Sequence, residues 1–187
     1  MYARIKTSRE KPKVRLKRIR ISNFKSFKEA ELEFNKINIL IGPNASGKSN
    51  FVDVFRFLKR VFTQRGWPFL PHLPWWSAKN LAYEYNVEEP IKIGLDFECY
   101  TGDSEYRVAY DMVFSITGDT LMLSHEKLEV LNYVTILREG GIIKVIHSEN
   151  ALDELKVKEK IKEEIMRGIT TSRIARVSIR GIKKDIL

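Results

Sequence analysis

One short loop constrains the fold of this chain more than any other feature. Residues 42–49 read Gly-Pro-Asn-Ala-Ser-Gly-Lys-Ser and match the pattern G-x-x-x-x-G-K-[ST]. The two glycines permit backbone torsions that other residues avoid, so successive N–H groups can turn inward around phosphate oxygens. Such a loop indicates a phosphate-binding site when a strand precedes it and a helix follows it.

The flanking residues fit that requirement. Residues 37–41 form a short apolar run rich in β-branched side chains, which predicts a buried strand covered on both faces. After the loop, apolar side chains recur at helical spacing and predict an amphipathic helix. They are Phe51, Phe55, Leu58 and Phe62. We therefore predict a nucleotide site, in which Lys48 reaches the β- and γ-phosphates and Ser49 is a ligand of Mg²⁺.

Composition limits the classes of protein to which the chain can belong. Its 187 residues are 43% apolar, which is enough for one domain with a hydrophobic core. Its N-terminus is basic and no stretch of 18 apolar residues occurs, so we expect no membrane span and no signal peptide. Cys99 is the single cysteine, which excludes an intramolecular disulfide. These features favour a cytoplasmic location.

Charge is unevenly distributed along the chain, whose formal net charge is +9. Residues 1–28 carry eleven Lys or Arg against one acid, and residues 156–187 carry ten against four. The middle, 29–155, has twelve against nineteen. Basic ends on an acidic middle indicate either a polyanionic partner such as DNA or simply solvated termini.

Most of the remaining pattern is typical of strands. Two alternating segments, 14–22 and 30–34, precede the loop, and the apolar phase slips between Leu16 and Ile19, which predicts a bulge. From residue 89 an antiparallel meander is expected. Its five strands lie near 89–99, 106–116, 121–131, 133–137 and 142–146. Between the helix and the meander, a proline-rich segment carries Trp67, Trp75 and Trp76. These side chains either cap the core, which is the interpretation we favour, or stack on bases or hold a partner protein.

The predicted fold class is α/β: a P-loop core sheet with a following helix, plus an antiparallel β-meander subdomain. We expect a basic arm over 1–13, the P-loop lobe over 14–150 and a charged helical extension over 151–187.

Two motifs together resemble a known family. Residues 21–27 read ISNFKSF, and the phosphate loop begins at residue 42. This arrangement resembles the N-terminal ATPase lobe of the SMC/RecF branch of the ABC-type ATPases, and is most similar to RecF-like and OLD-nuclease-like AAA-type ATPases. The resemblance covers about residues 14–150. It implies ATP with Mg²⁺ as the ligand, with Ser49 on the metal and Asn44 near the γ-phosphate, facing a dimer partner.

The resemblance also implies which residues contact ATP. Lys25 matches the basic residue of the family that approaches the phosphates, although a lysine at a strand end can also be merely solvated. Lys48 is the expected catalytic residue. The expected ATP-binding residues are Gly42, Pro43, Asn44, Ala45, Ser46, Gly47, Lys48, Ser49, Asn50 and Lys25.

Three motifs of the family are not found in this sequence: the glutamine loop, the signature motif and a Walker B strand that ends in Asp-Glu. Gln64 lies too close to the loop to serve as the glutamine loop. Residues 91–96 resemble a Walker B strand, but their apolar and polar residues alternate as in a half-exposed strand. Phe97 occupies the position of the second acid of that motif. Without that carboxylate, hydrolysis would need a second ATPase lobe or a homodimer.

Three other interpretations stay open. A P-loop kinase or GTPase is disfavoured, because the [NT]-K-x-D motif that reads guanine in GTPases does not occur in the sequence. The second is a basic nucleic-acid-binding module in which nucleotide binding is secondary. The third is a truncated, degenerate ATPase that folds without functioning.

Overall fold

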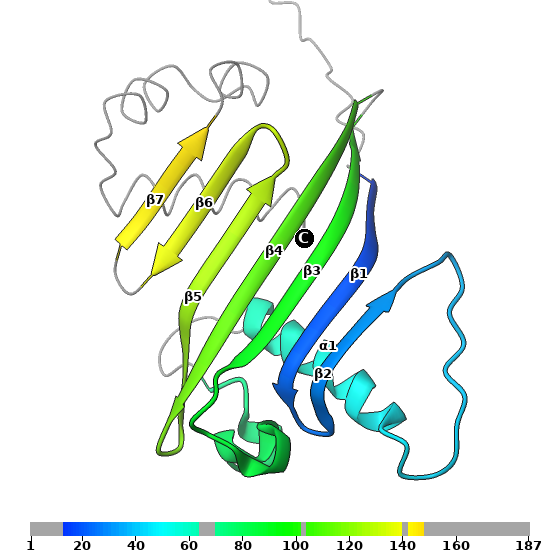
Figure 1. Cartoon of the computed structure of the whole chain (residues 1–187), viewed down its shortest axis with the longest axis vertical. Coiled ribbons are helices and arrows are strands. Elements are labelled where there is room, and N and C mark those ends of the chain that lie inside the picture. Colours follow the sequence, from blue (N-terminus) through cyan, green and yellow to red (C-terminus); the bar gives the residue numbers. More distant parts are fainter. Residues whose placement is uncertain (1–12, 64–69, 102–103, 140–141, 148–187) are drawn as a thin grey trace, which may run out of the picture.

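The fold is dominated by one seven-stranded antiparallel sheet, with strand order β2-β1-β3-β4-β5-β6-β7 (Figure 1). The computed structural model describes residues 13–63, 70–101, 104–139 and 142–147. The strands are β1 Lys13–Phe24, β2 Phe27–Glu33, β3 Ile91–Thr101, β4 Ser104–Thr117, β5 Thr120–Val130, β6 Val134–Glu139 and β7 Ile142–His147. Helix α1, Lys48–Thr63, crosses one face, and three 3₁₀ turns follow it: η1 Leu73–Trp75, η2 Ala78–Leu81 and η3 Tyr83–Tyr85.

Several predictions are confirmed by this sheet. Strands β3 to β7 form the predicted meander, and the helix follows the phosphate loop. The pairing of β1 with β3 shifts between Leu16 and Arg18, where the slip in the apolar phase predicted a bulge. The predicted basic arm, apart from Lys13 in β1, and the predicted charged helical extension over 151–187 lie outside the described residues.

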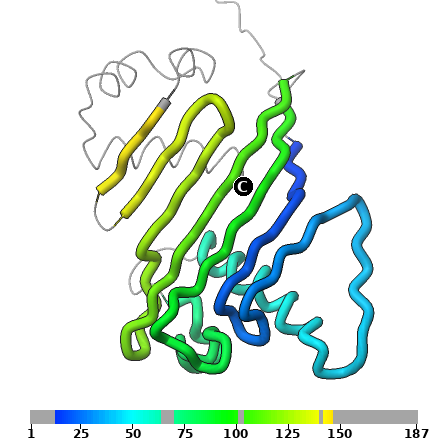
Figure 2. The backbone as a smooth tube through the Cα atoms, in the orientation of Figure 1, coloured from blue at the N-terminus to red at the C-terminus, as the bar shows by residue number. Residues whose placement is uncertain are grey.

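The prediction of a buried strand before the phosphate loop is wrong. Residues 37–41 form no strand, and they belong to the long segment that loops away from the sheet between β2 and α1 (Figure 2). Ile37, Ile39 and Ile41 are 81%, 81% and 86% exposed. No strand of the described residues runs beside them, so neither their backbone groups nor their side chains have a layer to pair with. The predicted P-loop core sheet is therefore not formed by this part of the chain.

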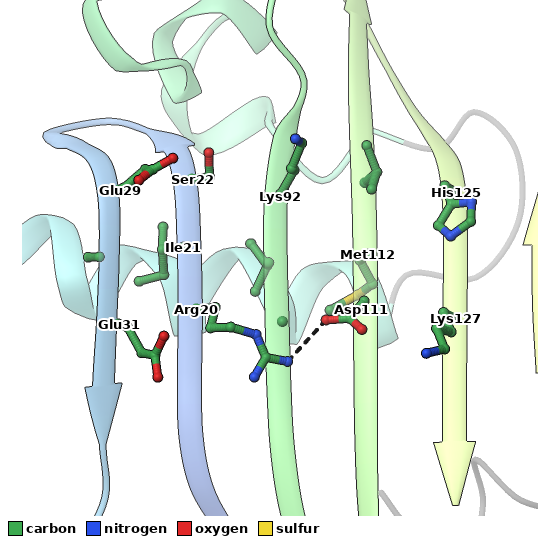
Figure 3. Close-up of a pocket in the computed structure, with 14 residues that line it drawn as sticks. Arg20, Ile21, Ser22, Glu29, Glu31, Lys92, Asp111, Met112, His125 and Lys127 are labelled. Carbon is green, nitrogen blue, oxygen red and sulfur yellow. Dashed lines mark hydrogen bonds and ion pairs between the residues drawn. The ribbon is translucent and has the colours of Figure 1, made fainter. Parts of the chain in front are cut away.

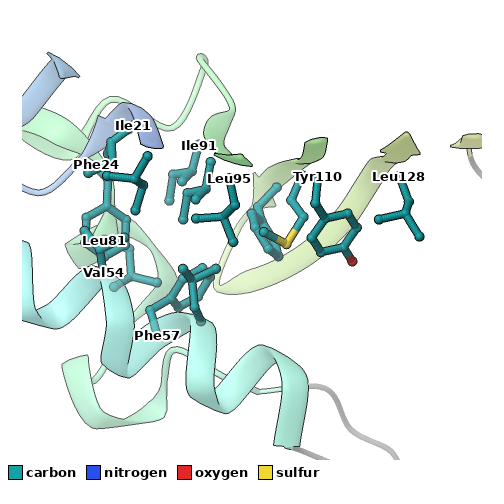
Figure 4. Packing of buried hydrophobic residues seen from close by; sticks show 14 of the residues in the cluster. Ile21, Phe24, Val54, Phe57, Leu81, Ile91, Leu95, Tyr110 and Leu128 are labelled. Atoms are coloured by element: carbon teal, nitrogen blue, oxygen red, sulfur yellow. The ribbon is translucent and has the colours of Figure 1, made fainter. Parts of the chain in front are cut away.

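The hydrophobic core lies between α1 and the sheet. Phe57 and Val54 are fully buried on the helix and face residues of the sheet such as Ile91 and Leu95 (Figure 4). The prediction of the apolar face of the helix is only partly confirmed. Leu58 is buried, whereas Phe51, Phe55 and Phe62 are half-buried at its flank, so the buried stripe is rotated toward Val54 and Phe57.

A bulge in β5 changes which side chains face the core. Val113 pairs with His125 and Phe114 pairs with Leu123, so Ser124 is the extra residue. Its hydroxyl donates to the Val113 carbonyl at 3.1 Å, and the residues that follow are shifted to the opposite face. The shift buries Leu128 and Val130, and it also buries Glu126 at 4% exposure. Glu126 accepts a hydrogen bond from Tyr110 and pairs with Arg138 at 3.4 Å.

The two tryptophans of the segment after α1 that the structure describes differ in burial. Trp75 is half-buried, packs against Phe57 with ring centroids 6.4 Å apart, and thus caps the core as predicted. Trp76 is 89% exposed on a backbone with φ of 69°, so the capping prediction is wrong for it. Trp67 lies outside the described residues.

A buried histidine in the same segment predicts a pH effect on stability. His72 is 1% exposed, and its Nδ1 has no hydrogen-bond partner among the described residues. Burial lowers the pKa of His72 below its ordinary 6.5, although the charge of Asp119 opposes this. The unfolded chain therefore binds this proton more readily, and stability that is present above pH 6.5 should be lost as pH falls below it. Urea unfolding at pH 8.0 and 5.5 checks this: His72→Gln should show a smaller loss than wild type, and equal losses would contradict it.

Candidate phosphate-binding site

The phosphate loop leads directly into the N-terminus of α1. The amide of Phe51 donates to the Gly47 carbonyl at 2.9 Å, so Gly47 caps the first turn of the helix. Gly47 has φ of 89°, and a Cβ there would lie 3.0 Å from Ser26 Oγ, so only glycine fits without strain. Ala45 also has a positive φ, 63°, which turns the loop back on itself. The free N–H groups of the first helical turn and the positive end of the helix dipole therefore converge on the loop.

Lys48 points back into the loop rather than away from it. Its Nζ donates to the carbonyl oxygens of Gly42 and Pro43 at 2.7 and 2.5 Å and contacts Ser46 Oγ at 3.2 Å. The ammonium is thus held at the centre of the curve that the loop backbone describes. A cation so placed can neutralise phosphate oxygens bound by the surrounding N–H groups.

The other expected ligands lie on the exposed side of the same loop. Asn44, Ser46 and Ser49 are exposed, and Asn50 is half-buried in the first turn of α1. Backbone N–H groups, an ammonium and a serine hydroxyl suit a polyphosphate and a hard cation that prefers oxygen ligands. The donor set therefore fits ATP with Mg²⁺, and Ser49 would supply the hydroxyl for the metal.

Lys25 lies close to the loop, but its ammonium contacts a different group. It is in the turn between β1 and β2, directly before Ser26, the residue packed against Gly47. Its Nζ forms an ion pair with the carboxylate of Asp53 on α1. Contact of Lys25 with phosphate stays a prediction. Asp53 was missed, although its position four residues after Ser49 places it on the same helix face.

The residue that imitates a Walker B acid lies on the far side of the sheet. Asp96 accepts two hydrogen bonds from Arg20, at 2.6 and 2.9 Å, on the face opposite α1. The same face carries an open groove of about 740 Å³, in which Arg20 crosses Gly94 to reach Asp111 at 3.1 Å (Figure 3). A side chain at residue 94 would clash with both, since its Cβ would lie 2.6 Å from Asp111 Oδ1. This network pairs charges within the sheet and is separated from the phosphate loop.

Other chemistry is limited in the described part of the chain. There, no group of three or more His, Cys, Asp or Glu side chains is arranged to hold a metal ion. Cys99 is buried, and burial raises the pKa of its thiol. Gln64 lies outside the described residues. None of the described helices is both long and apolar enough to span a membrane.

Comparison with known proteins gives one family and several partial relatives. Residues 15–180 match the family described as AAA ATPase domain. The chromosome partition protein Smc of Methanocaldococcus jannaschii is 48% identical over 46 residues, which are 24% of this chain and 4% of that protein. The DNA replication and repair protein RecF of Phocaeicola vulgatus is 50% identical over 44 residues, 23% of this chain and 12% of that protein. RecF of Lactococcus lactis subsp. cremoris is 37% identical over 77 residues, 41% of this chain and 21% of that protein. The matched stretches thus cover at most about a fifth of these relatives.

Proposed function

We propose, from the premise that this chain belongs to the AAA ATPase domain family, that it is the ATP- and Mg²⁺-binding lobe of an SMC/RecF-like ATPase. The observation that carries the proposal is the loop at the N-terminus of α1, with Lys48 turned into its centre. Calorimetric titration of MgATP into the chain tests it, with GTP as the control nucleotide. Saturable binding of ATP is the expected result, and its absence would contradict the proposal.

We infer further that the lobe does not hydrolyse ATP alone. Hydrolysis needs a group that orients the attacking water. The acid that best matches the Walker B position, Asp96, lies on the face of the sheet opposite α1 and is neutralised there by Arg20. A second lobe or another copy of the chain would supply the missing group. Phosphate release by the chain alone should therefore stay at background even where ATP binds.

The exposed apolar segment before the phosphate loop indicates a surface that a partner covers. Ile37, Ile39 and Ile41 are each more than four-fifths exposed, and burying one such side chain is worth about 1.5–3 kcal/mol. A partner that adds strands beside residues 37–41 would gain this energy and would also satisfy the unpaired backbone.

The isolated chain should therefore self-associate through this segment. We expect concentration-dependent association in sedimentation, abolished by the double change Ile39→Asp and Ile41→Asp with little change in unfolding free energy, since both sites are exposed. Ile146→Asp, at a residue 59% exposed in β7, is the matched control and should associate like wild type. A wild-type chain that stays monomeric would contradict the prediction.

Nucleic-acid binding is the second candidate function, and the exposed indole of Trp76 favours it. An affinity for single-stranded DNA that falls steeply with salt and is unaltered by Lys48→Ala would support this function over the first.

A further inference from the structure

The groove on the face of the sheet opposite α1 is crossed by two rows of side chains. The strand pairings place one residue from each of β2, β1, β3, β4 and β5 in each row, and paired residues point to the same face. The first row is Glu29, Ser22, Lys92, Val113 and His125, and the second is Glu31, Arg20, Gly94, Asp111 and Lys127. Both rows line the groove of about 740 Å³ (Figure 3). The groove therefore runs across five strands.

Each charged member of the second row has an ion-pair partner within the sheet. The pairs are Arg20 with Asp96 and Asp111, Glu31 with Arg18, and Lys127 with Glu129. The nitrogen and oxygen atoms of these pairs lie 2.5–3.1 Å apart. The second row is therefore a wall whose charges are already matched.

The charged side chains of the first row are not matched in this way. Within the part of the chain that the structure describes, Glu29, Lys92 and His125 form no side-chain hydrogen bond or ion pair. Glu29 and Lys92 are exposed, and His125 is half-buried. The side chains between them, Ser22 and Val113, are short and do not cover them. The first row therefore offers an acid on β2, an ammonium on β3 and an imidazole on β5 to a ligand.

The spacing of these groups fits a chain better than a small molecule. Neighbouring strands lie about 4.8 Å apart, so the backbones at Glu29 and Lys92, and at Lys92 and His125, are about 10 Å apart. A ligand that meets all three groups must span about 20 Å, the length of about six residues of extended polypeptide. Small ligands are bound instead in clefts that enclose most of their surface, whereas this groove is open.

The opposite charges at the two ends of the row select the kind of chain. A nucleic-acid backbone is negative along its whole length and would set phosphates against Glu29. A polypeptide can carry bases at one end and acids at the other. An ammonium at Lys92 and an imidazole N–H at His125 both donate to carboxylates.

We propose that this groove is the docking site of a partner protein, which binds through a segment with basic side chains over Glu29 and acidic side chains over Lys92 and His125. The site lies on the face opposite α1 and the phosphate loop. The inference therefore goes beyond nucleotide binding and does not depend on it.

The test is the binding of a fluorescently labelled peptide to the whole chain, measured by anisotropy. The peptide Lys-Lys-Gly-Glu-Glu-Gly-Glu-Glu repeats its pairs of like charges at intervals of about 10 Å when extended, as the row requires. Lys92→Glu should weaken its binding about tenfold, because the variant sets like charges against each other. Glu29→Lys should also weaken it severalfold, although this change makes the chain more basic and the peptide is acidic overall.

The matched control is Lys144→Glu. Lys144 is an exposed lysine on the same face, two strands beyond Lys127 and outside the groove, so its variant should bind the peptide like wild type. Thermal unfolding shows whether each variant is folded, and if Lys92→Glu does not fold, Glu29→Lys decides. Lys92→Glu should bind MgATP like wild type, so failure of this inference would leave the proposed function standing, and the reverse.

Three results would overturn the inference. The first is a wild-type chain that does not bind the peptide. The second is an equal loss in Lys92→Glu and Lys144→Glu, which would show that the peptide responds to net charge alone. The third is displacement of the peptide by a single-stranded thymidine oligonucleotide that binds more tightly to Glu29→Lys, which would assign the groove to nucleic acid.

Discussion

Lys48→Ala should abolish measurable binding of MgATP while leaving the chain folded. The ammonium of Lys48 lies at the centre of the loop, within 2.7 Å of the Gly42 carbonyl and 3.2 Å of Ser46 Oγ. Its loss removes charge-assisted hydrogen bonds to two phosphate groups, at about 1.5–3 kcal/mol each. The affinity should therefore fall by about a hundredfold or more. The free energy of unfolding should change little, because the ammonium contacts the loop and not the core.

Calorimetric titration of the variant beside wild type makes this measurement. Lys59→Ala is the matched control, because Lys59 is an exposed lysine on the same helix, away from the loop. It should bind like wild type, which would show that the effect depends on position and not on total charge. A variant that loses its lysine at residue 48 and still binds ATP within threefold of wild type would contradict the assignment of the site.

The sequence predicted those parts of the site that depend on local spacing. The helix after the loop and the position of Lys48 follow from short-range constraints: glycine torsions, helical periodicity and the reach of one side chain. The antiparallel meander followed from strict alternation between turns, as in β4, where Tyr106 to Ile116 alternate. Each of these patterns lies within one segment and needs no distant partner. The structure therefore contains the elements that they predict.

Features that depend on distant partners were not predicted. Residues 37–41 have the composition of a buried strand, but burial needs a neighbouring layer, and the described part of the chain does not provide one. Glu126 is buried because a bulge at Ser124 reverses the alternation of β5, which composition alone does not reveal. The ion pair of Lys25 with Asp53 joins residues 28 positions apart, and only the packing of the turn on α1 brings them together.

Phe57→Ala should destabilise the lobe more than any other single truncation on α1. Phe57 is fully buried and its ring contacts those of Phe24, Phe114 and Trp75, with centroids 5.7, 5.1 and 6.4 Å away. Truncating such a side chain removes its buried area and leaves a cavity, at a cost of about 3–5 kcal/mol. That is a large share of the 5–15 kcal/mol typical of a folded domain. Urea unfolding of the variant beside wild type measures the loss.

Phe55→Ala supplies the matched comparison, because Phe55 lies on the same helix but is only half-buried, against Phe51 and Phe34. It should cost about 1–2 kcal/mol, in proportion to the smaller apolar area that it buries. The difference between the losses in unfolding free energy of the two variants shows which side chains of α1 pack on the sheet. Since this helix begins at Lys48, directly after Gly47, the packing of Phe57 also sets where the phosphate loop lies relative to Lys25. Equal losses for the two variants would mean that the helix rests on its Phe51–Phe55 flank, which would also displace the ion pair of Lys25 with Asp53.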